Sequence, residues 1–195
     1  MSLTLIQTGP LARTSLALAE RLKLVFPPAR FEHAFMPAKI TPAEWKSLTR
    51  RTPFVGLGWT EIAPRREASR LFDGESHWTV YLVAKNAAGL AARYHGDRQG
   101  PGLFQMVQAA VAVLHGWTVE EIGTAFVDRA GNLFAEGWDA DDVAIAGIDV
   151  SVGLTMPIAE ALGGTEPDAL TALGIVWNFE ATGEYPDVII KEAAA

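Results

Sequence analysis

The chain has 195 residues, 49% hydrophobic and 20% charged, with no cysteine, so we expect one globular domain without disulfides or thiolate metal sites. Its net charge of −7 is divided unevenly: residues 1–100 hold 14 Lys and Arg against 8 Asp and Glu, and residues 101–195 hold 2 against 15. No run of 18 apolar residues and no basic leader before an apolar stretch occurs, so we expect neither a membrane span nor a secretory signal.

The N-terminal third predicts two helices around a short extended segment. Residues 11–26 form an amphipathic pattern that ends at Pro27-Pro28, and residues 30–36 alternate weakly, as in a strand or a loop. A capping box that begins at Thr41 predicts a second helix over residues 41–51.

The middle of the chain predicts strands. Residues 53–62 favour a strand in which two glycines indicate a bulge or a close backbone approach. Residues 64–74 are polar and basic and predict a loop, whereas residues 76–85 alternate regularly and give the clearest strand. The glycine-bearing residues 86–100 predict a mobile loop.

Residues 101–116, PGLFQMVQAAVAVLHG, predict a central helix that lies across the sheet. The segment has no charged residue and is apolar almost all round, which is typical of a helix buried on more than one side, so a contact with a neighbouring subunit is also open. After it, residues 125–127 and 133–135 predict a hairpin around the turn DRAGN, and residues 142–156 predict a long inner strand.

We divide the chain into an α+β domain, residues 1–157, and a C-terminal extension, residues 158–195. The extension contains two strand-like pieces, residues 174–180 and 187–191. It is either a hairpin that completes the sheet or an arm that packs on a neighbour, and the sequence does not separate the two.

The sequence contains little that indicates catalysis, a cofactor or a metal. Its four histidines lack the spacing of helical metal ligands, and no phosphate-binding or nucleophile-elbow motif occurs. The best acid–base pair is His95 with Asp97 in the loop over residues 93–98. A small-molecule enzyme centred on that loop is therefore the alternative, and it requires a concave pocket that contains both side chains.

The opposed charge of the two halves permits three interpretations: nucleic-acid binding, pairing of the halves within one chain, and contact between copies in a head-to-tail ring. DNA binding in a neck component would need Arg50, Arg51, Arg65, Arg66 and Arg70 on one face. Because the basic residues are dispersed, we rank the ring above nucleic acid. Its interface would join a basic rim to an acidic one, formed by Arg65, Arg66, Arg70, Arg93 and Arg98 and by Asp139, Asp141 and Asp142.

The order of these elements, with FVGLGWTEI, WTVYLVAKN, GLFQMVQAAVAVLHGW and IDVSVGLTMPI, resembles the small tail-completion proteins of Mu-like prophages. More distantly, it resembles the tail-terminator proteins of long-tailed phages. The similarity covers roughly residues 10–157 and includes no catalytic signature.

The resemblance implies an α+β fold in which an antiparallel sheet carries two main helices on one face, plus the C-terminal extension. It implies a ring, commonly of six copies, that caps the tail tube and contacts tube, sheath or neck proteins. We therefore expect a structural protein of the virion tail, present in the host cytoplasm during assembly, with no catalytic residues, no cofactor, no metal and no membrane partner.

Overall fold

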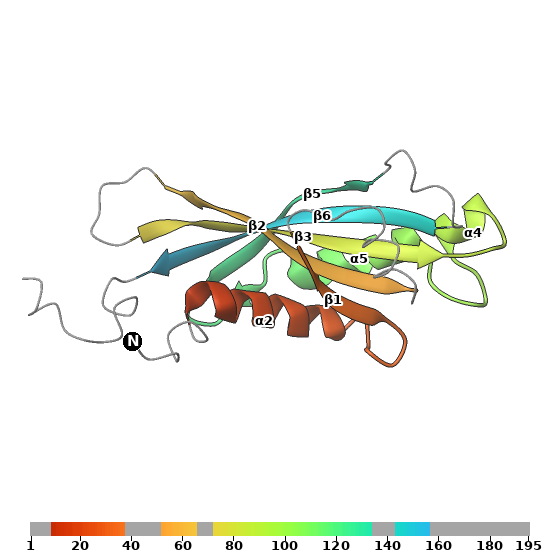
Figure 1. The fold of residues 1–195 in the computed structure, drawn as a ribbon, viewed down its shortest axis with the longest axis horizontal. Coiled ribbons are helices and arrows are strands. Elements are labelled where there is room, and N and C mark those ends of the chain that lie inside the picture. Colours follow the sequence, from red (N-terminus) through yellow and green to blue (C-terminus); the bar gives the residue numbers. More distant parts are fainter. Residues whose placement is uncertain (1–8, 38–51, 66–71, 134–142, 157–195) are drawn as a thin grey trace, which may run out of the picture.

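A computed structural model describes residues 9–37, 52–65, 72–133 and 143–156. It has one six-stranded sheet in the order β1-β2-β3-β6-β5-β4, with helices α2, α4 and α5 (Figure 1). In chain order the elements are α2 (Pro10–Lys23), β1 (Glu32–Met36), β2 (Phe54–Pro64), β3 (Phe72–Lys85), α4 (Leu90–His95), α5 (Leu103–Leu114), β4 (Thr118–Val119), β5 (Gly123–Asn132) and β6 (Val143–Met156).

The two longest strands, β3 and β6, form the centre of the sheet. They pair antiparallel over their full lengths, from Phe72 opposite Met156 to Lys85 opposite Val143. All neighbouring pairs are antiparallel except β1 and β2, which run parallel. The predicted α+β class is confirmed, and the parallel edge strand is the one departure from an antiparallel sheet. Parallel neighbours need a crossover connection, which periodicity within a strand does not reveal.

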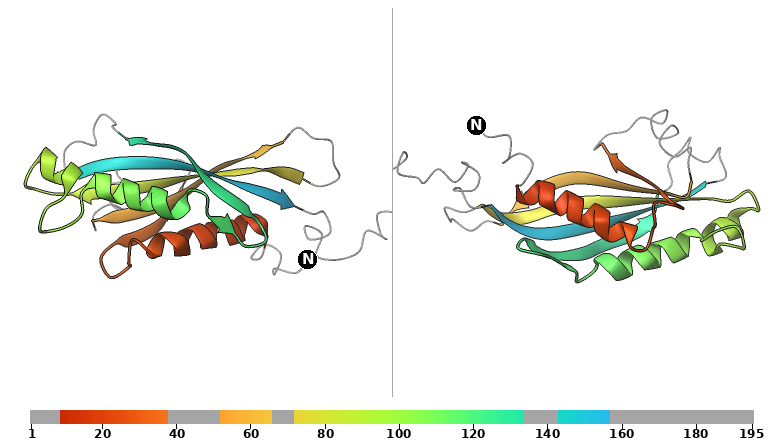
Figure 2. Two further views of the ribbon diagram at one scale, coloured as in Figure 1. Left: turned by 180° about the vertical axis from the view of Figure 1, so that it is seen from behind. Right: turned by 90° about the horizontal axis from the view of Figure 1, so that it is seen from below.

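Helices α2 and α5 lie on the same face of the sheet (Figure 2), as the resemblance implied. The inward side of β3 alternates through Trp78, Val80 and Leu82, which are 3%, 0% and 0% exposed. Leu18 and Leu22 of α2 pack against this layer because they lie four residues apart on one side of the helix. These contacts make one continuous core between the helices and the sheet.

The predicted helix over residues 11–26 and the predicted strand over residues 76–85 are both present, with different ends. α2 ends at Lys23, and β3 begins at Phe72, so part of the predicted loop over residues 64–74 is strand. Pairing of residues 72–75 with β6 overrides their weak individual strand preference. The segment 30–36 contains the strand β1, and the predicted helix over residues 41–51 lies outside the described residues.

Two predictions in the second half of the domain are wrong. The loop over residues 86–100 contains the helix α4, since Leu90 to Arg93 favour a helix between flanking glycines. The predicted hairpin turn DRAGN is part of the continuous strand β5, which pairs with β6 across a bulge between Val127 and Arg129. The bulge absorbs an extra residue, so turn-forming residues remain in the ladder.

The face of the sheet opposite the helices carries a smaller apolar cluster. Met36, Phe54, Val83 and Ile145 form it at 0–6% exposure. The glycines predicted to permit a close approach lie here, because a Cβ at Gly56 would be 2.6 Å from Met36 Cγ. Toward β5 this outer face carries polar residues such as Thr79 and Asp149 together with the exposed Phe126.

Candidate assembly interface

The surface of α5 that points away from the sheet is exposed and uncharged. Leu103, Met106, Ala110 and Leu114 form the buried side of this helix. The opposite side, called here the α5 outer face, consists of Phe104, Gln105, Gln108 and Ala112, all exposed. No Asp, Glu, Lys or Arg occurs between Arg98 and Glu120, so the helix itself contributes no charge to this face, and Arg21 of α2 contacts α5 at the carbonyl of Val113. The predicted helix is thus present, but within the described structure the sheet buries only one of its sides.

An aromatic corner continues this face at the end of the sheet where β3 ends and α5 begins. The ring of Phe104 lies 5.1 Å from that of Tyr94 and 5.2 Å from that of His95, the latter edge to face. Phe104 is nevertheless 48% exposed, and Leu90 of α4 is 65% exposed. These four residues, Leu90, Tyr94, His95 and Phe104, are called the aromatic tip.

Hydrogen bonds fix the aromatic tip to both helices and to the sheet. Gln105 Nε2 donates to the carbonyl of His95 at 3.1 Å, while Gly102 N donates to Gln105 Oε1 at 3.2 Å. Asn132 Nδ2 of β5 donates to the Tyr94 hydroxyl at 2.8 Å. Because the connection between α4 and α5 is held by side chains, the exposed rings are ordered in advance, which lowers the entropy cost of contact with a partner.

The described residues of the predicted basic rim lie at opposite ends of the sheet. Arg93 and Arg98 are at the aromatic tip, and Arg93 Nε donates to the carbonyl of Asn86 at 3.1 Å. Arg65 follows the far end of β2. The 14 residues of β3 separate the two ends by roughly 43 Å. The other predicted rim residues, Arg66, Arg70, Asp139, Asp141 and Asp142, lie outside the described residues.

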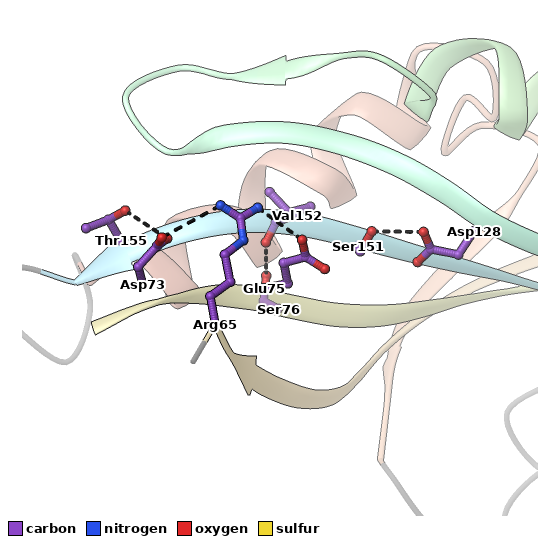
Figure 3. Close-up of polar contacts among 8 residues, drawn as sticks. All are labelled: Arg65, Asp73, Glu75, Ser76, Asp128, Ser151, Val152 and Thr155. Carbon is purple, nitrogen blue, oxygen red and sulfur yellow. Dashed lines mark hydrogen bonds and ion pairs between the residues drawn. The ribbon is translucent and has the colours of Figure 1, made fainter. Parts of the chain in front are cut away.

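Arg65 forms ion pairs with two carboxylates of its own chain, as Figure 3 shows. Its Nη2 lies 3.1 Å from Glu75 Oε1 and its Nη1 lies 3.7 Å from Asp73 Oδ2. Thr155 of β6 donates to the same Asp73 at 3.5 Å. One guanidinium between two carboxylates leaves this cluster with a formal charge of −1, so Arg65 is not a net basic surface feature.

The polar cluster around Arg65 borders a shallow hollow of about 260 Å³. The hollow lies beside the start of β5 and is lined by Gly123, Phe126, Ser151 and Gly153 among others. Ser151 Oγ donates to Asp128 Oδ1 at 3.0 Å (Figure 3). The polar side chains that border the hollow, Arg65, Asp73, Glu75, Ser151 and Thr155, therefore have partners within the chain.

Asp149 links three strands on the outer face of the sheet. It accepts hydrogen bonds from Thr79 Oγ1 at 3.0 Å and from Arg129 Nε at 3.2 Å. Burial, followed by the negative charge of Asp149, raises the pKa of Tyr81, and a hydrogen bond with Thr79 opposes this shift. Sequence analysis missed this cluster because Arg129 was assigned to a turn, although the bulged strand places it opposite Asp149.

The two residues of the enzyme alternative have separate structural partners. Asp97 accepts hydrogen bonds from Asn86 Nδ2 at 2.8 Å and from the backbone of Gln99 at 2.7 Å, and these bonds lower the pKa of the exposed Asp97 carboxyl. The His95 ring packs on Phe104. Within the described ranges no hydrogen bond joins His95 to Asp97, so the geometry gives them no shared acid–base function.

The described part of the chain contains neither a metal-site arrangement nor a membrane-spanning helix. No group of three or more His, Asp or Glu side chains there is arranged to hold a metal ion. None of the described helices has the length and apolar character needed to cross a bilayer.

Comparison with known proteins identifies the family. The family model described as bacteriophage Mu, Gp37 matches residues 10–146. Among solved structures, a chain from the "Virion of native gene transfer agent (GTA) particle" is 15% identical, covers 79% of this chain and 99% of its own length, and has a TM-score of 0.43. None of the curated proteins compared with the chain matches it. The family match confirms the resemblance to Mu-like phage proteins, and it spans more than half of the sequence, from α2 into β6: the chain belongs to the bacteriophage Mu Gp37 family.

Proposed function

We propose that this phage structural protein assembles head to tail into a closed ring that caps a tail tube, the role of a tail terminator. The observation that carries the proposal is the uncharged, exposed α5 outer face beside the aromatic tip. A contact between two different surfaces, repeated from copy to copy, generates a ring when the rotation closes. The protein then acts by binding, without a catalytic step.

The composition of the α5 outer face supports contact with protein. A helix that faces water normally carries charged residues on its solvent side. Interface cores are depleted of charge and enriched in aromatic residues, and Phe104 supplies such an aromatic anchor, 48% exposed, at the start of the face. The glutamines at positions 105 and 108 add hydrogen-bonding capacity without a charge to desolvate.

Two arginines at the aromatic-tip end of this surface fit the rim of an interface. Arg98 is exposed at the same end of the sheet as the aromatic tip. We place Arg93 and Arg98 at the edge of the contact, opposite the acidic residues Asp139, Asp141 and Asp142 of the next copy. Such rim pairs steer association and contribute little affinity in salt.

The experiment compares Ala112→Glu, in the centre of the α5 outer face, with Ala130→Glu. Both alanines are exposed, so both variants should fold, which circular dichroism will verify. Light scattering then measures the oligomers that form, alone and with the purified tube protein. We expect discrete oligomers from the wild type and from Ala130→Glu. Ala112→Glu should associate at least about tenfold more weakly, or about 1.4 kcal/mol, because a charge is desolvated in the contact.

Two results would overturn the proposal. One is a wild-type chain that stays monomeric at high concentration with tube protein present. The other is normal assembly of Ala112→Glu, which would remove the α5 outer face from the contact.

A further inference from the structure

The edge strand β1 leaves one side of the sheet open within the described structure. β1 is the first strand in the sheet order, and Glu32 N donates to the carbonyl of Pro53 beside β2. In a parallel ladder the alternate residues point their backbone groups the other way, so His33 and Phe35 direct theirs to the outer side of β1. Phe35 is also 59% exposed. An edge of this kind can pair with an additional strand.

An apolar groove runs beside this edge, between β1 and α2. It has a volume of about 170 Å³, and its lining includes Leu22, Lys23, His33, Phe35 and Leu57. His33 is fixed there, because its Nε2 lies 2.7 Å from the carbonyl oxygen of Phe26. We call this the β1 groove. Its volume suits one aromatic side chain of a strand added to β1, on the same face of the sheet as α2.

The C-terminal extension contains a segment that matches the groove. In residues 174–180, GIVWNFE, the apolar side chains of Ile175, Trp177 and Phe179 alternate, so a strand would present all three on one face. Residues 158–195 hold seven acidic residues against Lys191, a net charge of −6. The described residues 9–37 hold four basic residues against two acidic ones. Charge therefore favours this pairing as well.

The length of the extension allows residues 174–180 to reach a neighbouring copy. The extension follows Met156, at the end of β6. Leu57, in the β1 groove, pairs with Val80 of β3, which in turn pairs with Ile148 of β6. Eight residues of β6 separate these levels, or roughly 26 Å. Residues 157–173 bridge up to roughly 56 Å when extended, so residues 174–180 can reach past their own subunit, and the proposed head-to-tail ring supplies the groove of the next copy as the acceptor.

We propose that residues 174–180 of one copy add a strand to β1 of the next copy and place the face that carries Ile175, Trp177 and Phe179 against its β1 groove, which at about 170 Å³ accepts one aromatic ring. This inference rests on the proposed ring, because it names a second contact between the same neighbours. The extension then joins each subunit to the next through a contact that is separate from the α5 outer face. It also lies beyond residue 146, where the family match ends.

Because the chain has no cysteine, introduced cysteines can test the contact directly. One full-length variant carries Phe35→Cys, and a second, with a different mass tag, carries Ile175→Cys, Trp177→Cys or Phe179→Cys, which sample the strand register. The two are mixed and oxidised, and their disulfide-linked pairs are weighed by mass spectrometry. Strand partners bring Cα atoms within the roughly 7 Å that a disulfide needs. Phe126→Cys is the control acceptor, since Phe126 is also an exposed aromatic, 50% against 59% for Phe35.

We expect at least one arm position to form mixed pairs with Phe35→Cys in about tenfold excess over pairs with Phe126→Cys. The inference would be overturned if, at all three positions of the extension, mixed pairs with Phe35→Cys and with Phe126→Cys formed in equal yield. So would a chain carrying both Phe35→Cys and an arm cysteine that forms only a disulfide within itself. If light scattering still detects oligomers in those cases, only the arm contact fails. If no oligomer forms with tube protein present, the ring and the arm contact fail together.

Discussion

Substitution of Gly123 by alanine tests the packing of the β4–β5 hairpin against β6. Gly123 begins β5, opposite Val119 of β4, and a Cβ placed on it would lie 2.1 Å from the carbonyl oxygen of Gly153. A carbon atom normally stays about 3.3 Å from such an oxygen, so β5 must move by roughly 1 Å. The obstacle is backbone, which cannot turn aside as a flexible side chain can.

The expected cost of Gly123→Ala is about 2–4 kcal/mol. Overpacking contributes about 1–3 kcal/mol, and one or two weakened backbone hydrogen bonds contribute about 0.5–1.5 kcal/mol each. In a chain of 195 residues this corresponds to a fall in melting temperature of about 6–12 °C. Urea denaturation and a thermal scan measure both quantities.

Gly131→Ala is the matched control, since it changes the same residue type in the same strand. No heavy atom lies within 4 Å of a Cβ placed there. Its stability should therefore stay within about 1 kcal/mol of the wild type, with a gain favoured because alanine restricts the unfolded chain. If the two variants unfold within about 0.5 kcal/mol of each other, the described approach of β5 to β6 is wrong.

Three other substitutions or titrations test the core, the α4–α5 connection and the outer face. Leu18→Ala, at a position 0% exposed, should cost about 2–5 kcal/mol in urea denaturation. Hydrogen bonds to the Asp97 carboxylate, first from Asn86 and then from the Gln99 backbone, lower its pKa below the ordinary 3.8. The ionised carboxylate therefore stabilises the fold above that pH, and this stabilisation is lost as the pH falls through the lowered pKa. The stability difference between wild type and Asp97→Ala should thus shrink from pH 6 to pH 3. Absorbance titration should find the pKa of Tyr81 above 10.0, and Asp149→Asn should lower it only partly, because burial is the larger cause.

Periodicity predicted the elements whose burial is one-sided and regular. The strand β3 alternates buried and half-buried residues from Gly74 to Leu82, and α5 repeats its buried residues at helical spacing. The course of β5 was not predictable in the same way. Its residues DRAGN are typical of a turn, and only pairing with the long strand β6 keeps them extended. A ladder between distant segments outweighs local preference there, and a single sequence does not contain that information.

The helix at the candidate interface was predictable from the sequence, but the surface that it forms with the aromatic tip was not. The absence of charge around α5 is visible in the sequence, whereas the aromatic tip depends on the α4–α5 connection. Leu90 belongs to a segment that was predicted to be a loop, although LAAR after Gly89 is a short run of helix formers. A sequence signal for α4 therefore existed, and the surrounding glycines concealed it.

The salt dependence of assembly separates the uncharged contact from an ionic one. The opposed charge of the two halves is partly neutralised inside the chain, since Arg13 pairs with Glu121 of the other half at 2.8 Å, and the basic Arg65 is already paired with Glu75 of its own half at 3.1 Å. We therefore expect the α5 outer face to dominate association, and the association constant should change less than about threefold between 50 and 500 mM salt, where exposed charges are screened. Light scattering of the wild type across that range measures it, with Arg98→Glu as the variant that alters an exposed charge at the rim. A fall of tenfold or more with salt would contradict this reasoning and assign the contact to the ionic rim, including its charged residues outside the described ranges.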